Sequence, residues 1–309
     1  MVLRPLPRED QWLNRFHLDA RRRVRAGAQG GHLTRRRGQS LRFREFTPYL
    51  AGDDIRAVDW RQSARFGPDH DLLVRRFEAE EPLTLIVTLD ARPSMWLPQP
   101  LPKMQIALWL TEALARLTCK QGDTFVLHQL ATGKVYPVKT RRAADTLVER
   151  CRLAPGETAP VNLGQLERTM PPAAVWLVVS DFYSEAPQCH AALADLWRRA
   201  ARKHVWRTLI DVNAWPMERA LLGQGARHIL GPGQRLEQPF FQVDNGVLAQ
   251  VEQRIQTAKH AVQQPLQLKP QDARTWFWPE QSELDADAAL AFFRAQFQQD
   301  PLLKRLFMR

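Results

Sequence analysis

Acidic and basic side chains lie close together in residues 46–65, which read FTPYLAGDDIRAVDWRQSAR. Gly52 permits a tight backbone turn, and Asp53 and Asp54 follow it, where turns favour short side chains that accept hydrogen bonds. Arginine pairs strongly with carboxylates that are sheltered from water, often through two hydrogen bonds. The arginines within reach are Arg56, Arg61 and Arg65. The spacing therefore predicts a turn that is locked by ion pairs.

Asp59 and Trp60 complete this stretch. Trp60 supplies a large apolar ring with one N–H donor, and we expect it to anchor the turn. Two interpretations stay open, because the stretch is either a structural motif that only stabilises the fold or a functional site. We favour the structural motif, since ion-pair networks perturb the chemistry of a site only in some proteins.

Three aspartates stand at the ends of segments that are predicted to be buried strands. They are Asp90, Asp181 and Asp211. In open α/β sheets, ligands bind at the carboxyl ends of the strands. We therefore expect these three side chains to lie along the ligand-binding edge of one sheet.

The sheet is predicted from an alternation of apolar runs and helical patterns. Nearly continuous apolar runs such as residues 83–89 are typical of buried parallel strands. The predicted strands span residues 83–89, 125–130, 134–138, 175–179 and 205–210, and the predicted helices span residues 103–120, 141–151, 163–169 and 191–201. The fold class is therefore α/β, with a mostly parallel sheet, helices on both faces and one hairpin strand.

The predicted domain organisation has three parts. Residues 1–82 read as a basic, β-containing N-terminal module that begins with a short helix near residues 12–25. Residues 83–265 carry the sheet. Residues 266–309 read as a C-terminal extension, in which a strand pair precedes a helix that docks on the domain.

Positive charge is concentrated at the start of the chain. The 309 residues have a net charge of +11, and residues 1–76 contain 17 arginines against nine acidic residues. Dense basic runs can meet nucleic acid, anionic lipid or an acidic protein face. We favour a solvated arginine-rich face or a protein partner over nucleic acid, with any membrane contact peripheral at most.

Signals for catalysis, secretion and membrane insertion are weak. The motifs H-E-x-x-H, G-x-x-x-x-G-K-[ST] and G-x-S-x-G are missing, and His128 reads as a packed or edge residue of a strand rather than a catalytic base. We find no apolar run of about 18 residues, no signal peptide and no paired cysteines. The sequence predicts a cytoplasmic protein that is not an enzyme; a hydrolase has only the carboxylates in its favour.

Residues 46–65 resemble the signature of a bacterial family called domain of unknown function 58 (DUF58), roughly Y-x-P-G-D-D-x-R-x-I-D-W-x-x-x-A-R. The matching residues are Pro48, Gly52, Asp53, Asp54, Arg56, Asp59, Trp60, Ala64 and Arg65. The resemblance implies a binding protein that works with MoxR-type AAA+ ATPases and other A-domain proteins. It also implies a von Willebrand factor A-like (Rossmann-like) domain after the signature.

In a von Willebrand factor A-like domain, the motif D-x-S-x-S, a threonine and a further aspartate hold a divalent cation. Oxygen ligands of this kind suit Mg²⁺. Here Asp90, Ser94 and Asp181 match three of the five positions. The strand that ends at Asp90 and the helix over residues 103–120 resemble the start of such a domain.

Two positions depart from that pattern. Arg92 stands where the first serine is expected, and Val161 stands where the threonine is expected, with Thr158 three residues earlier. Arg92 places a positive charge where the cation would bind, and it can pair with Asp90 or Asp181. We therefore predict a degenerate, metal-free site with weak or absent Mg²⁺ binding, and an interaction rim that includes Arg92 and Thr158.

These observations favour a non-enzymatic adaptor that works with a MoxR-type AAA+ ATPase in the assembly or remodelling of other proteins. The strand-end rim is its expected contact face, and the signature is expected to be a scaffold between domains. The alternative is a nucleic-acid-binding protein that uses the arginine-rich N-terminal module. Its affinity would fall steeply with salt, because binding releases counterions.

Overall fold

The computed structural model describes residues 3–8, 11–18, 41–50, 55–65, 72–79, 83–99, 101–151, 161–183, 187–223, 243–269, 272–278 and 285–308. The chain divides into two compact units. The larger unit consists of Met1–Val24 and Leu83–Arg309, and the smaller unit is Arg25–Pro82. Each unit is described separately below.

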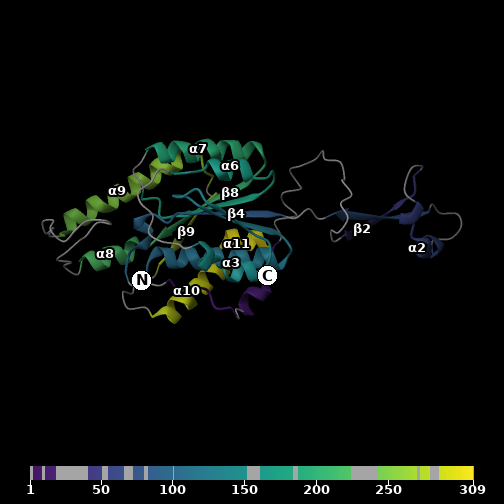
Figure 1. Cartoon of the computed structure of the whole chain (residues 1–309), viewed down its shortest axis with the longest axis horizontal. Helices are drawn as coiled ribbons and strands as arrows, with labels where there is room; N and C mark the ends of the chain where they lie inside the picture. The colour runs from purple at the N-terminus through teal and green to yellow at the C-terminus, as the bar shows by residue number, and fades with distance from the viewer. Residues whose placement is uncertain are drawn as a thin grey trace. The chain divides into compact units, whose positions relative to one another are not determined.

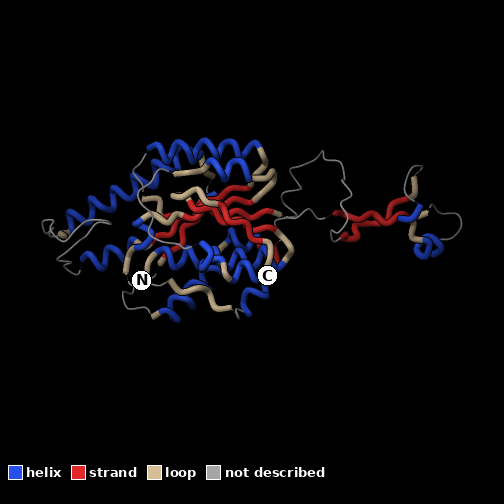
Figure 2. The backbone as a smooth tube through the Cα atoms, in the orientation of Figure 1, coloured by secondary structure: helices blue, strands red, loops and turns tan. Residues whose placement is uncertain are grey.

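The larger unit is built around a six-stranded sheet, drawn in red in Figure 2. Its strands are β4 (Thr84–Leu89), β5 (Thr124–Gln129), β6 (Val135–Val138), β7 (Val175–Ser180), β8 (Trp206–Asn213) and β9 (Ala273–Phe277). Their spatial order is β6-β5-β4-β7-β8-β9, and only β6 runs antiparallel to its neighbour. This is the strand order of a doubly wound sheet, whose connections change direction between β4 and β7. The predicted α/β fold with one hairpin strand is confirmed.

Helices cover both faces of the sheet (Figure 1). One face carries α3 (Lys103–Lys120), α4 (Arg141–Asp145), α5 (Leu147–Cys151), α8 (Trp215–Gly223), α10 (Ala286–Gln299) and α11 (Pro301–Leu306), and the other carries α6 (Gly164–Thr169), α7 (Pro187–Arg202) and α9 (Asn245–Gln263). Successive strand residues point to opposite faces, so Leu85 and Val87 pack with the α3 cluster and Ile86 packs with the α7 cluster. Short 3₁₀ segments are η1 (Gln11–Arg15), η3 (Pro93–Trp96) and η4 (Gln264–Leu266).

Helix α3 is buried on all sides except at its last residue, Lys120, although its sequence predicts a helix with one apolar face. Residues 3–8, which we name the N-terminal strap, cover its outer side. Gln105 and Trp109 bind the backbone of Arg4, and Glu112 accepts a hydrogen bond from the amide of Leu6. The strap therefore belongs to the larger unit, and the predicted module of residues 1–82 is wrong in this respect.

A segment near the start of the chain pairs with a segment near its end in the larger unit. β1 (His17–Leu18) pairs antiparallel with β10 (Phe307–Met308). The helix predicted near residues 12–25 is instead η1 followed by β1 over the described residues. The predicted docking of the C-terminal helix is confirmed, since Phe293 and Phe297 of α10 are buried in the α3 cluster.

Residues 266–309 are an integral part of the larger unit rather than an extension of it. The strand pair predicted at residues 266–279 is wrong over the described residues, because β9 is a single strand that pairs in parallel with β8. It completes the sheet. Trp276, on β9, is buried and donates from Nε1 to Asp300 at 2.9 Å.

A polar chain runs through the centre of the sheet. The indole nitrogen of Trp176 donates to Thr88 Oγ1 at 2.8 Å, and Thr88 Oγ1 lies 3.2 Å from His128 Nδ1. His128 Nε2 lies 2.9 Å from the backbone oxygen of Asn162. His128 is fully buried, which decides between the packed and the edge position that the sequence left open, and burial lowers its pKa to about 4. The imidazole is therefore neutral at physiological pH.

The smaller unit is a β-hairpin that carries two short helical segments. β2 (Leu41–Pro48) pairs antiparallel with β3 (Leu73–Ala79). Between them lie η2 (Ile55–Ala57) and α2 (Trp60–Arg65). Among the described residues of both units, no helix is long and apolar enough to cross a membrane.

Candidate functional site

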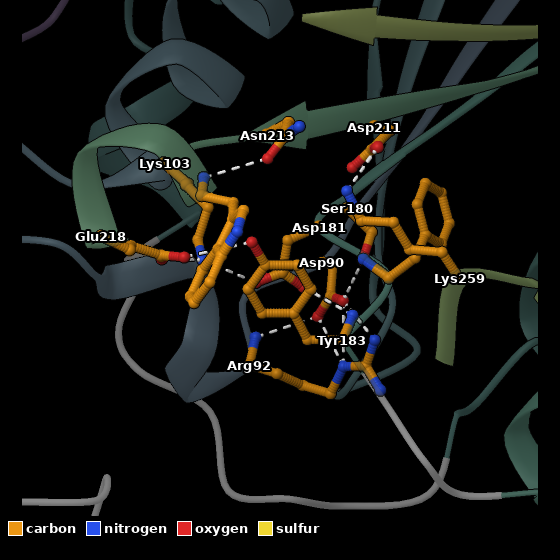
Figure 3. Close-up of polar contacts among 12 residues, drawn as sticks. Asp90, Arg92, Lys103, Ser180, Asp181, Tyr183, Asp211, Asn213, Glu218 and Lys259 are labelled. Atoms are coloured by element: carbon orange, nitrogen blue, oxygen red, sulfur yellow. Dashed lines mark hydrogen bonds and ion pairs between the residues drawn. The ribbon is translucent and has the colours of Figure 1, made fainter. Parts of the chain in front are cut away.

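The strand ends bring together the three predicted aspartates, as Figure 3 shows. Asp90 follows β4, Asp181 follows β7, and Asp211 lies near the end of β8. These three strands are neighbours, so their carboxyl ends share one edge of the sheet. Asp90 and Asp181 have no exposed surface and Asp211 is 8% exposed. The predicted meeting of these side chains is confirmed.

Arg92 closes the site on the β4 side. Its Nε lies 2.9 Å from both carboxylate oxygens of Asp90, and its Nη2 donates to Asp90 Oδ2. Ser180 donates a further hydrogen bond to Asp90 Oδ2 at 2.6 Å. Burial lowers the pKa of Arg92, but the hydrogen bonds and charge of Asp90 outweigh burial and raise it. The predicted Arg–Asp ion pair is present, and both oxygens of Asp90 are occupied.

Lys103, the first residue of α3, holds the second aspartate. Its Nζ lies 3.1 Å from Asp181 Oδ2 and 2.5 Å from Glu218 Oε1, and the side chain is 1% exposed. The ammonium group also lies 4.1 Å from the ring centroid of Tyr183, whose hydroxyl donates to Glu218. Burial raises the pKa of Tyr183, and the nearby charge of Glu218 adds to this. Tyr183 is therefore a neutral donor.

Lys259 of α9 holds the third aspartate. Its Nζ donates to Asp211 Oδ2 at 2.6 Å, and the pair is almost fully buried. Burial raises the pKa of Asp211 to about 6, against the opposing effect of Lys259. The charge of Asp181 also raises it. Each strand-end aspartate therefore has its own cationic partner.

Sequence reasoning missed Lys103, Lys259, Glu218 and Tyr183. One signal was available, because the chain has only eight lysines and Lys103 begins the helix that follows Asp90 and Arg92 in the chain. Lys259 lies on a different helix, and nothing local in the sequence connects it with Asp211.

Within the described part of the chain, the remaining predicted metal ligands do not complete a cation site. Ser94 lies in η3 and is half-buried, Val161 offers no side-chain oxygen, and Thr158 lies outside the described residues. Among the described residues, no group of three or more His, Cys, Asp or Glu side chains is arranged to hold a metal ion. A divalent cation beside Asp90 or Asp181 would also meet the positive charges of Arg92 and Lys103, so the donor set does not fit Mg²⁺ while these ion pairs are formed.

The DUF58-like signature lies in the smaller unit. Asp59 is buried, and its Oδ1 accepts hydrogen bonds from the amides of Arg61 and Gln62 at 3.1 Å each, so it caps α2. Trp60 is 58% exposed, so the prediction that it anchors the turn is wrong. Asp59 is buried where it caps α2, and the side chain of the next residue, Trp60, points away from it into solvent. Arg56 and Arg65 are also exposed. Gly52, Asp53 and Asp54 lie outside the described residues.

Comparison with known proteins identifies the family of the chain. No curated protein matches the chain. One solved structure that matches is described as the crystal structure of the SpRpn10 VWA domain; it is 9% identical, with a TM-score of 0.37, and the match covers 72% of this chain and 97% of that one. The family described as "Protein of unknown function DUF58" matches residues 45–257. That match covers more than half of the chain, including the signature and the three strand-end aspartates, and the protein is therefore a member of the DUF58 family.

Proposed function

We propose that this protein is a non-enzymatic adaptor that binds a MoxR-type AAA+ ATPase and takes part in the assembly or remodelling of other proteins. One observation carries the proposal: every aspartate at the strand-end edge is held by its own cation. The edge where a doubly wound sheet would bind a substrate is therefore filled by closed ion pairs.

The arrangement of these ion pairs disfavours catalysis. A general acid or base must come within hydrogen-bonding distance of the substrate, directly or through one water molecule. Asp90 and Asp181 have no exposed surface, and both oxygens of Asp90 already accept hydrogen bonds within the protein. Buried ion pairs of this kind suit the support of a binding surface better than a reaction site.

The rim above these ion pairs suits an acidic partner. The Arg92 side chain is 13% exposed and carries a fixed positive charge at the edge of the site. Ser94 lies two residues further along the same turn, in η3, and is half-buried. We infer that Arg92 takes the place of a bound cation and attracts a carboxylate of the partner without Mg²⁺.

A pull-down of the full chain from its host tests the adaptor proposal. The tagged protein is captured at low and high salt, with and without nuclease, and bound proteins are identified by mass spectrometry. We expect an AAA+ ATPase that stays bound at high salt. Recovery of nucleic acid that leaves with salt, and of no ATPase, would instead support the alternative of nucleic-acid binding through the arginine-rich N-terminal segments.

Two variants of one residue test the rim. Ser94→Glu adds a negative charge close to Arg92 without removing any ion pair, whereas Ser94→Gln adds a neutral side chain of similar size. We expect Ser94→Glu to recover less ATPase than Ser94→Gln, because like charges repel. Equal recovery by the two variants would exclude an acidic contact at this rim.

A further inference from the structure

We propose that a cavity at the carboxyl ends of β8 and β9 binds a neutral saccharide. The cavity has a volume of about 590 Å³ and lies between these two strands and α9. Its size is that of a small-molecule site, and its position is where doubly wound sheets bind their ligands. Of the strand-end aspartates, Asp211 lines the cavity, whereas Asp90 and Asp181 do not. The inference goes beyond the adaptor proposal, and neither depends on the other.

The register of β8 and β9 fixes the strand side of the cavity. Parallel pairing places Asp211 opposite Thr275, and Asn213 opposite Phe277. Because side chains alternate along a strand, these four side chains lie on one face of the sheet. Leu209, two residues before Asp211, packs with the α7 cluster, so this is the face that α7 and α9 cover. The strand ends therefore present a compact group of side chains to α9.

Polar side chains of α9 form the opposite side. Gln256, His260 and Gln263 follow the i, i+4, i+7 spacing of one helix face, and all three line the cavity. Within the described part of the chain, these three side chains and the Thr275 hydroxyl have no hydrogen-bond partner. The Asn213 carboxamide accepts from a backbone amide of α8 through its oxygen, which leaves its nitrogen to donate. Five side chains can therefore bind a ligand in one volume.

The balance of charge favours a neutral ligand. Lys259 is the only lysine or arginine among the described residues that line the cavity, and its Nζ already donates to Asp211 Oδ2 at 2.6 Å (Figure 3). A phosphate or carboxylate is usually held by a cation that is free to pair with it. Asp211 Oδ1 accepts no hydrogen bond from the described residues, so its negative charge also disfavours an anion.

The mixture of polar groups with one ring favours a saccharide over a nucleobase. Phe277 is 50% exposed and is the one apolar side chain among the described lining residues. The face of an aromatic ring is electron-rich, so it attracts the polarised C–H groups of a sugar ring. Sugar hydroxyls both donate and accept, as the carboxamides of Gln256 and Gln263 do. An isolated base is instead held by stacking between aromatic or apolar side chains, and this lining offers one ring.

Binding of neutral saccharides to the full chain tests the proposal. The tagged protein is applied to an array of immobilised neutral mono- and oligosaccharides, and the strongest binder is then titrated by calorimetry. Inorganic phosphate and adenosine are titrated in parallel. We expect saturable binding of a neutral saccharide that does not change with salt concentration, because no charge on the ligand is screened. We expect no binding of phosphate or adenosine.

Matched variants locate the site. Gln256→Ala and Phe277→Ala should each weaken the saccharide Kd about fivefold, the loss expected for one hydrogen bond or one ring contact. Phe277→Tyr keeps the ring and should retain the affinity. Gln253→Ala is the control for Gln256→Ala, since Gln253 is also an exposed glutamine of α9 but does not line this cavity. It should leave the Kd unchanged, and both glutamine variants should unfold at the wild-type temperature.

Three results would overturn the proposal. The first is binding of no neutral saccharide by the wild type. The second is equal saccharide affinity for the wild type, Gln256→Ala and Phe277→Ala, which would place the saccharide elsewhere. The third is binding of phosphate or adenosine that these two variants weaken, which would assign the cavity to another ligand. None of these results bears on the adaptor proposal, which the ATPase pull-down tests separately.

Discussion

Lys103 Nζ lies 3.1 Å from Asp181 Oδ2 and 2.5 Å from Glu218 Oε1 at a site that excludes nearly all solvent from the lysine. One ammonium group therefore forms ion pairs with two carboxylates that come from different parts of the chain. Since separated buried charges are costly, the geometry of the strand-end edge depends on this cation.

Replacement of Lys103 by methionine should destabilise the protein strongly. The variant keeps the side-chain volume but leaves Asp181 and Glu218 without their cation, which typically costs about 3–5 kcal/mol of unfolding free energy. Urea unfolding monitored by tryptophan fluorescence measures this. Lys304→Met, on an exposed face of α11, is the control and should change stability by less than about 0.5 kcal/mol. Similar unfolding of both variants would show that the Lys103 pairs contribute little.

His128 should make the protein less stable in acid. Burial lowers its pKa to about 4, below the ordinary value of 6.5, so the unfolded state binds more protons between these values. The free energy of unfolding therefore has its full value above about pH 6.5. It decreases as the pH falls towards 4, by about 2 kcal/mol at pH 5. His128→Gln should lose less stability than the wild type between pH 7.5 and pH 5. The exposed His260 supplies the control, and His260→Gln should follow the wild type.

Magnesium should not bind the wild-type protein with micromolar affinity, because Arg92 and Lys103 already occupy the two central aspartates. Titration calorimetry measures this directly. The double substitution Arg92→Ser with Val161→Thr supplies the two oxygen ligands that the von Willebrand factor A-like pattern lacks and removes one positive charge. It should bind Mg²⁺ more tightly than the wild type. Saturable micromolar binding by the wild type that Asp90→Ala abolishes would contradict the metal-free interpretation.

Removal of the N-terminal strap should destabilise the larger unit. Arg116 donates to the backbone oxygens of Leu6 and Pro7 at 2.8 and 2.5 Å, and Glu112 accepts from the Leu6 amide at 2.5 Å. Deletion of residues 1–8 exposes apolar surface and takes partners from two buried charges, which we expect to cost at least about 3 kcal/mol. Arg4→Ala is the control, since α3 binds the backbone of Arg4 and its side chain is exposed. A deletion variant that melts like the wild type would show that the strap is dispensable.

Local sequence patterns were sufficient to predict the architecture of the larger unit. The apolar run of β4 predicts a buried parallel strand, and the order of strands and helices predicts a doubly wound sheet. Asp90, Asp181 and Asp211 were found because parallel strands end at a common edge. The Arg92–Asp90 pair was predicted because the two residues lie only two positions apart, in the same short segment after β4. The signature at residues 46–65 was enough to indicate the family.

The tertiary structure alone decided which cation meets which aspartate, and which side of the signature faces water. Lys259 reaches Asp211 from α9, and Glu218 reaches Lys103 from α8, because helix packing brings together residues that are far apart in the chain. The Asp59 amide donates to the Leu73 oxygen, and the Ser63 hydroxyl accepts from the Leu73 amide, so this side of α2 faces the strands and Trp60 lies exposed. Periodicity records which residues share a face of one element, whereas the partner of that face depends on the packing of the whole unit.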